Sequence, residues 1–242
     1  MENNNNNYTY QSVVQLDDEK TASRKYLANV FLWMFVALAI SAFCAYEFAT
    51  STGLLSLIVG PTGFTTLGYV AVFSPLAFSL VMQFGFNRIS YPVMVLLFIA
   101  YAVAIGISLS ILGLIYTSSS LLSVFITASL VFGVMAVAGY VTKTDLSTFG
   151  SILIMIFIGA FIASLVNFFI ASEQFDYLLS YVFVALMVGL TAYYMQMLKR
   201  IGEGIEFGTA ESKKLVIIGA FVLYTTFINL FLSLLRIFGR RR

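Results

Sequence analysis

Long apolar runs occupy most of the chain, and only short polar stretches separate them. A bilayer core about 30 Å thick requires about 20 apolar residues in a helix that rises about 1.5 Å per residue. Each run has roughly 20 to 26 residues with almost no charge inside, so each is predicted to form one membrane-spanning helix. The seven runs are Leu27–Ala49, Phe64–Phe84, Tyr91–Tyr116, Leu121–Val141, Gly150–Ala171, Tyr177–Leu198 and Leu215–Phe238.

This pattern predicts an all-α integral membrane protein, a bundle of seven transmembrane helices. A membrane β-barrel would instead alternate apolar and polar residues over segments of about ten residues. Residues 1–25 are polar and begin with an asparagine tract, so they are predicted to form a disordered tail. The transmembrane domain is predicted to cover residues 26–239, and residues 240–242 form a basic tail.

Composition agrees with this pattern and excludes several classes of protein. Of the 242 residues, 60% are hydrophobic and 10% are charged, against about 45–50% and 25% in a soluble domain. This leaves little chain for a cytosolic enzyme or a nucleic-acid-binding domain. The net charge of +2 is too small to indicate a polyanionic partner. The expected surroundings are the lipid bilayer.

Catalytic and metal-binding side chains are scarce. The chain has no histidine and a single cysteine, Cys44. A Ser-His hydrolase or a zinc protease needs histidine, and an intramembrane aspartyl protease needs two facing carboxylates within its spans. None of these sets is present in the sequence, so we expect no enzyme activity, no metal and no cofactor.

Basic residues predict the orientation in the membrane. With a cytoplasmic N-terminus, the segments on the inner side carry nine basic residues, whereas the loops near 53–63, 117–120 and 172–176 carry none. We therefore expect a cell membrane protein, in the inner membrane if the source is bacterial. The last run leaves two alternatives. A full span places Arg240, Arg241 and Arg242 outside, and a re-entrant helix keeps them inside; length favours the full span.

Few polar groups fall inside the predicted spans. Glu47 lies near the end of the first run, where a carboxylate can reach headgroup water or face a cavity as an ion ligand. Asn167, Gln196 and Asn229 are uncharged amides within spans. They are candidates for a polar pathway, and contacts between helices are the competing interpretation.

Several short segments then point to a known family. These are Thr127-Ala128-Ser129, Gly139-Tyr140-Val141-Thr142-Lys143-Thr144-Asp145-Leu146, Gly189-Leu190-Thr191-Ala192-Tyr193 and Phe227-Ile228-Asn229-Leu230-Phe231, followed by Leu234-Leu235-Arg236. In order and spacing they resemble the bacterial branch of the Bax inhibitor-1 family, and the likeness covers nearly everything after Tyr26.

The resemblance implies a bundle whose last helix is surrounded by the other six. It also implies a calcium leak governed by pH, protection from cell death in eukaryotic members, and, in a bacterial relative, interaction with a membrane-bound protease. The family's leak is attributed to two aspartates, on the sixth and last helices, that share a hydrogen bond. Two carboxylates held so close cannot both ionise cheaply, so protonation closes this latch.

This chain departs from the family pattern at both latch positions. The first aspartate position holds Tyr194 and the second holds Thr226. Their hydroxyl groups can form hydrogen bonds but do not change charge near neutral pH. We therefore expect a neutral contact between the two helices, without proton sensing.

Three charged residues outside the spans match the family in position. Arg88 stands alone before the third span, where its expected role is topological. Lys143 and Asp145 lie in a predicted cytoplasmic turn, and Asp145 is expected to cap the following helix rather than to bind an ion.

Two functions remain in competition. The first is a passive ion leak, of the calcium type, without the acidic latch. The second is a regulatory protein that does not transport and instead binds a membrane protease or another membrane assembly.

Overall fold

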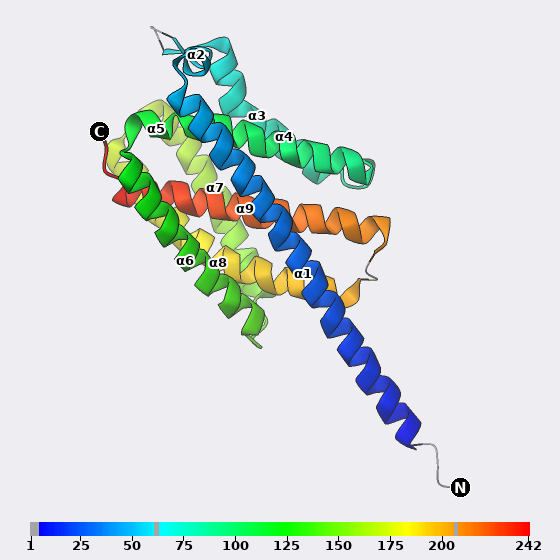
Figure 1. Ribbon diagram of the computed structural model, residues 1–242. Helices are drawn as coiled ribbons and strands as arrows, with labels where there is room; N and C mark the ends of the chain where they lie inside the picture. Colours follow the sequence, from blue (N-terminus) through cyan, green and yellow to red (C-terminus); the bar gives the residue numbers. More distant parts are fainter. Residues whose placement is uncertain (1–4, 61–62, 206–207) are drawn as a thin grey trace.

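The computed structural model describes residues 5–60, 63–205 and 208–242 and is helical almost throughout (Figure 1). Seven of the described helices are long and apolar enough to cross a membrane, as predicted. They are α1 (Asn5–Thr50), α3 (Thr66–Phe84), α4 (Tyr91–Ser110), α6 (Ser118–Val141), α7 (Ser147–Ile170), α8 (Glu173–Gly204) and α9 (Ala210–Phe238). The short elements α2 (Thr52–Ser56), β1 (Val59–Gly60), β2 (Gly63–Phe64) and α5 (Leu112–Ile115) connect them.

The last helix, α9, forms the core of the bundle. In its most apolar window 67% of the residues are buried, against 11% for α3 and 17% for α7. The helices α1, α4, α6 and α8 pack directly on α9, whereas α3 packs mainly on α4 and α7 mainly on α8. The predicted central last helix is therefore present, and the six other helices surround it in two layers.

Small residues allow the helices around this core to approach closely. A Cβ atom added to Gly106 of α4 would lie 2.6 Å from the carbonyl oxygen of Ser41 in α1. A Cβ atom added to Gly139 of α6 would collide with the backbone of Ala192 in α8. Such contacts between helix backbones are typical of membrane proteins, where dispersion replaces the hydrophobic effect between helices.

The N-terminal segment differs from the prediction of a disordered tail. Residues 1–4 lie outside the described residues, and α1 already begins at Asn5, so it projects beyond the bundle (Figure 1). No glycine or proline occurs before Gly53, and residues 11–20 include the good helix formers Gln, Leu, Glu and Lys. Nothing in the sequence ends the helix between this segment and the membrane-spanning part.

The C-terminal tail lies beside the connection between α5 and α6. Arg242 donates its backbone N–H to the carbonyl of Ile115 at 2.9 Å, and Thr117 donates to the carbonyl of Arg240 at 3.2 Å. Helix α9 is continuous from Ala210 to Phe238 and does not turn back. The tail therefore lies at the same end of the bundle as the loop at 117–120, in agreement with a full span.

Candidate functional site

A partly open cavity of about 750 Å³ lies beside α9 and is bordered by α7, α8, and α3 with the turn that follows it. Tyr194 of α8 and Thr226 of α9 both line the cavity. Asn229 on the next turn of α9, with Gln83 and Asn87, adds further neutral polar groups, and the remaining wall is largely aliphatic and aromatic. The two positions at which the resemblance implies a latch therefore share one cavity.

The two hydroxyl groups are not bonded to each other. Thr226 donates its hydroxyl to the carbonyl of Val222, one turn earlier in α9, at 2.8 Å. Within the described part of the chain, no hydrogen bond joins Thr226 to Tyr194, and no acidic or basic side chain lines the cavity. The two side chains line the same cavity from different helices, Tyr194 from α8 and Thr226 from α9, and the neutral contact expected between them stays a prediction.

A positive charge lies beside this neutral cavity. Lys214 near the start of α9 donates from Nζ to the carbonyl of Phe86 at 3.3 Å, and its ammonium lies 5.6 Å from the centre of the Phe86 ring. Phe86 itself lines the cavity. An ammonium in this position repels a cation that enters from the same side.

Sequence reasoning missed a layer of hydroxyl groups that extends from the edge of the cavity, where Thr225 lines it, to α1 and α4. The Tyr224 hydroxyl lies 2.6 Å from Oγ of Ser41 in α1, and Ser41 donates to the carbonyl of Ala102 in α4 at 2.7 Å. The hydroxyl groups of Tyr101 and Thr225 lie 3.2 Å apart. Tyr101 and Tyr224 both fall inside predicted spans, where a buried hydroxyl needs a hydrogen-bond partner. Their positions in the sequence could therefore have predicted polar contacts between these helices.

Neutral polar groups continue along α9 away from the cavity. Asn229 donates from Nδ2 to the carbonyl of Thr225 at 3.0 Å, and Ser233 donates to the carbonyl of Asn229 at 2.8 Å. The spacing of residues 226, 229, 233 and 236 places them along one helix face. At the far end, Arg236 forms an ion pair with Asp176 at 3.0 Å, a partner that sequence reasoning missed.

The other two amides of the predicted pathway lie elsewhere. Asn167 donates to the carbonyl of Ser172 at 3.2 Å and accepts its N–H at 3.3 Å, which braces the turn between α7 and α8. Gln196 donates to the carbonyl of Thr144 at 2.8 Å and accepts the N–H of Leu146 at 2.9 Å. Both side chains hold loops, and neither lines the cavity.

Glu47, Arg88 and Lys143 also lie apart from the cavity. Glu47 is half-buried near the carboxyl end of α1, and no ion pair to it occurs in the described ranges. Arg88 is exposed between α3 and α4, and Lys143 is exposed between α6 and α7. Over the same ranges, no group of three or more His, Cys, Asp or Glu side chains is close enough to hold a metal ion.

Asp145 stabilises the start of α7. Its Oδ1 accepts the backbone N–H of Ser147 at 2.9 Å and pairs with Arg200 of α8 at 2.9 Å. Hydrogen bonds from the side chain and the backbone of Ser147, and then from Arg200, lower the pKa of Asp145 to about 2. The carboxylate therefore remains charged at physiological pH.

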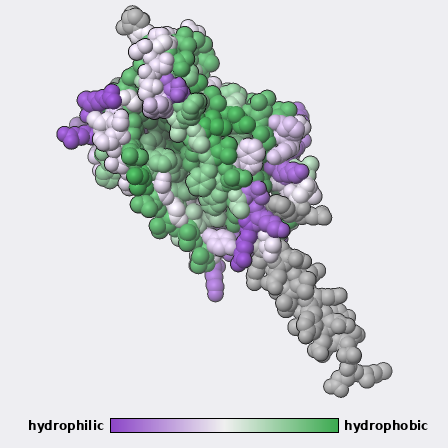
Figure 2. All heavy atoms as spheres, in the orientation of Figure 1, coloured by the Kyte–Doolittle hydropathy of each residue, from purple (hydrophilic) through white to green (hydrophobic). Residues whose placement is uncertain are grey.

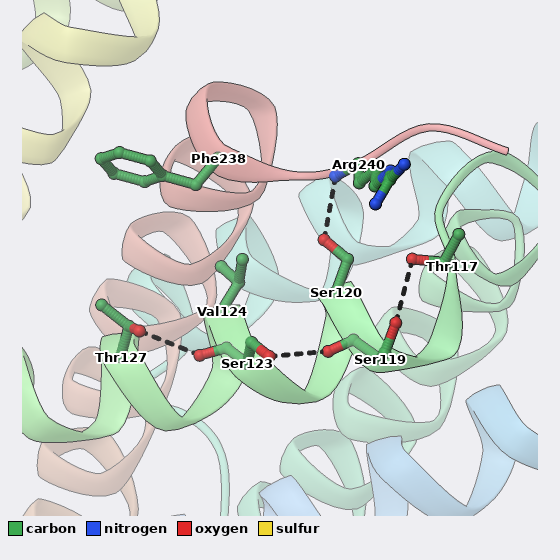
Figure 3. A pocket seen from close by; sticks show the side chains of 8 residues that line it. All are labelled: Thr117, Ser119, Ser120, Ser123, Val124, Thr127, Phe238 and Arg240. Carbon is green, nitrogen blue, oxygen red and sulfur yellow. Dashed lines mark hydrogen bonds between the residues drawn. The ribbon is translucent and has the colours of Figure 1, made fainter.

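A second, hydroxyl-rich pocket of about 460 Å³ lies at the opposite end of the bundle (Figure 3). The N–H of Arg240 donates to Ser120 Oγ at 2.9 Å, while Ser123 and Thr127 donate to carbonyls of their own helix at 2.8 and 2.9 Å. These hydroxyl groups are occupied by contacts within the protein, and the pocket is a consequence of docking the tail on α6.

Comparison with known proteins gives consistent matches over nearly the whole chain. A model of the family described as "Inhibitor of apoptosis-promoting Bax1" matches residues 23–242. The inner membrane protein YbhL of Escherichia coli is 40% identical over 234 residues, which are 96% of this chain and 97% of the relative. Uncharacterized protein RP147 of Rickettsia prowazekii is 38% identical over 222 residues, 90% of this chain and 91% of the relative.

Proposed function

Because this multi-pass membrane protein belongs to the Bax inhibitor-1 family, we propose that it is a passive, non-enzymatic leak for small cations such as calcium. The observation that supports this proposal is the cavity beside α9, which is lined by Tyr194 and Thr226, the residues at the two positions where the resemblance implies aspartates. By analogy with YbhL, the membrane is the inner membrane of a bacterium. The excess of basic residues in the segments on one side of the membrane supports a cytoplasmic N-terminus.

The chemistry of the cavity wall suits a leak better than storage or pumping. Calcium takes oxygen ligands, and the hydroxyl and amide oxygens of Tyr194, Thr226 and Asn229 can replace part of its hydration shell. Neutral oxygens bind a divalent ion more weakly than carboxylates do, so an ion that enters can also leave. Charged groups lie at both ends of the row of polar residues from Thr226 to Arg236 on α9. The ammonium of Lys214 lies beside one end, and the ion pair between Arg236 and Asp176 lies at the other. Both restrict the passage of a cation, so the flux is slow.

The same neutral wall removes the pH response. In the family pattern, two neighbouring carboxylates repel each other when both are ionised, and uptake of one proton lets them close. A tyrosine, with an ordinary pKa of about 10, and a threonine both remain neutral between pH 5 and 8. The flux through this chain therefore does not follow pH over that range.

The experiment is calcium flux into vesicles that contain the purified protein and a calcium indicator. Unmodified protein is expected to give a slow flux above that of protein-free vesicles, equal within about twofold from pH 5 to 8. The double variant Tyr194→Asp with Thr226→Asp is expected to restore a flux that rises with pH. Each single variant serves as a control, because one carboxylate has no like-charged neighbour at the latch.

Two results contradict the proposal. An unmodified protein whose flux changes many-fold between pH 5 and 8 contains another titrating gate. A protein that adds no flux at any pH is not a leak. The variant Lys214→Gln sharpens the test, because removal of the ammonium beside the cavity is expected to raise cation entry.

A second candidate function rests on the extension of α1. This helix begins at Asn5, whereas its membrane-spanning part covers Thr21–Thr50. The extension is a surface outside the bilayer to which a membrane protease or another assembly can bind. The protein would then have a regulatory role, such as one in a stress response. Removal of residues 1–20 separates the two functions: a leak keeps its flux, whereas a regulator without flux loses its co-purifying protease.

A further inference from the structure

An apolar groove runs along the seam between α1 and α6, which do not pack closely on each other. Its first part has a volume of about 770 Å³ and extends from Arg24 to Ala42 on α1, opposite residues 125–140 of α6. Its second part, of about 580 Å³, continues to Thr50 and Arg242. Leu38, Ala42 and Phe125 line both parts, so the groove is continuous.

The groove follows the full depth of the apolar region. From Arg24 to Thr50 the helix rises about 39 Å, close to the thickness of a bilayer with its headgroups. Figure 2 shows this face of the molecule, where the apolar surface is hollowed between the two helices and hydrophilic residues gather toward the ends. The part that begins at Arg24 therefore has an apolar trough with a cation at its polar end.

We propose that the part of the groove that begins at Arg24 is a binding site for an anionic phospholipid, with its acyl chains along the seam and its phosphate at Arg24. The guanidinium is exposed at the end of the trough, where it can form charge-assisted hydrogen bonds with phosphate oxygens. Tyr140 lies at the same end, with the ammonium of Lys199 4.9 Å from the centre of its ring. Basic pockets between transmembrane helices on the cytoplasmic side suit acidic headgroups.

The lining favours a lipid as the occupant. The wall of this part of the groove is apolar along its length and includes the aromatic side chains of Phe31, Phe35 and Phe132, which acyl chains can follow. Its cation, Arg24, lies at one end, as a headgroup phosphate above acyl chains requires.

Two pairs of variants isolate the two parts of the site. Arg24→Gln removes the cation at the groove, and Lys25→Gln removes the neighbouring exposed cation that does not line it. Gly133→Phe places a ring in the groove, and Gly159→Phe places the same ring on the exposed surface of α7. A Cβ atom added at either glycine meets no atom within 4 Å, so the two substitutions are matched in local space.

The measurement is native mass spectrometry of the full-length protein in detergent, with palmitoyl-oleoyl phosphatidylglycerol or the zwitterionic phosphatidylcholine as the probe. The unmodified protein is expected to retain phosphatidylglycerol in preference to phosphatidylcholine. Arg24→Gln should lower this retention about fivefold, the effect of one basic residue near the headgroups, while Lys25→Gln leaves it nearly unchanged. Gly133→Phe should abolish retention, and Gly159→Phe should not.

Three results overturn the proposal. The first is equal retention of the two lipids by the unmodified protein. The second is an equal loss of phosphatidylglycerol retention in Arg24→Gln and Lys25→Gln, and the third is normal retention by a folded Gly133→Phe protein. If Gly133→Phe does not purify as a monodisperse protein, the comparison of Arg24→Gln with Lys25→Gln decides alone. None of these measurements depends on calcium flux, so the lipid site and the proposed leak are tested independently.

Discussion

Tyr224 and Thr226 are two residues apart on α9, yet they face opposite kinds of environment. Tyr224 is fully buried, packs edge to face against the rings of Phe98 and Tyr101, and has a hydrogen-bond partner on α1. Thr226 lines a cavity of about 750 Å³ opposite Tyr194 and bonds only to its own helix. One face of α9 is therefore joined to its neighbours by polar contacts, and the other is open.

This difference separates polar groups that join helices from polar groups that line a cavity. A hydroxyl whose hydrogen bond reaches another helix, as in the pair of Tyr224 and Ser41, fixes the position of α1 against α9. A hydroxyl that bonds within its own helix, as in Thr226, forms no such link to the facing helix. Polarity alone does not distinguish the two, because both residues are ordinary members of the same apolar run.

The largest difference in the free energy of unfolding is expected between the alanine variants of Tyr224 and Tyr194, the two tyrosines in these environments. Tyr224→Ala leaves a void in a packed core and removes the hydroxyl partner of Ser41, so it should lower the free energy of unfolding by about 3–5 kcal/mol. Tyr194→Ala enlarges an existing cavity and should cost about 1 kcal/mol. Unfolding of the purified proteins in mixed detergent micelles measures both values.

The calcium flux of the same two variants provides the control. Tyr194→Ala should keep or increase the flux per folded protein, because it widens the cavity. Equal losses of stability in the two variants would mean that the two faces of α9 are packed alike, contrary to the comparison.

A smaller effect is expected when only the hydroxyl groups are removed. Tyr224→Phe keeps the ring and loses the hydrogen bond to Ser41, so the free energy of unfolding should fall by about 0.5–1.5 kcal/mol. Tyr194→Phe should leave it unchanged, because no hydrogen bond from this hydroxyl occurs in the described part of the chain. Thermal unfolding followed by circular dichroism tests the pair, and a destabilised Tyr194→Phe protein would contradict the difference.

The sequence alone was sufficient for the elements but only partly for the site. Hydropathy located all seven candidate membrane spans with ends that differ by at most six residues, because a bilayer sets their length and excludes charge. It could not tell that Gln196 and Asn167 hold loops, because the partners of an amide depend on which backbone groups lie beside it in three dimensions. The family motif predicted that Tyr194 and Thr226 face each other as a neutral pair, whereas neither the motif nor any periodicity in the chain predicts the cavity that both residues line.

The N-terminal segment and the ion pair at Arg236 were missed for another reason. A polar segment without glycine or proline can continue a helix once the following apolar run has nucleated it, and composition alone favoured disorder. Arg236 was noted only as part of a family motif, whereas in the structure its charge is balanced by Asp176, 60 residues earlier in the chain. Such pairing between distant segments becomes visible only after the helices have been placed.

The smallest effect on calcium flux and stability is expected from a substitution of Asp145, which lies in the connection between α6 and α7 and not on α9. Its pKa of about 2 lies below the ordinary value of 3.8, so its stabilising contribution is complete above about pH 4 and is lost as the pH falls toward 2. The carboxylate therefore does not titrate between pH 5 and 8. Asp145→Asn should leave the pH profile of calcium flux unchanged over that range, with any loss of stability equal at pH 5 and pH 8. A changed profile would mean that the connection between α6 and α7 controls permeation, because neither hydroxyl of the cavity can change charge at these pH values.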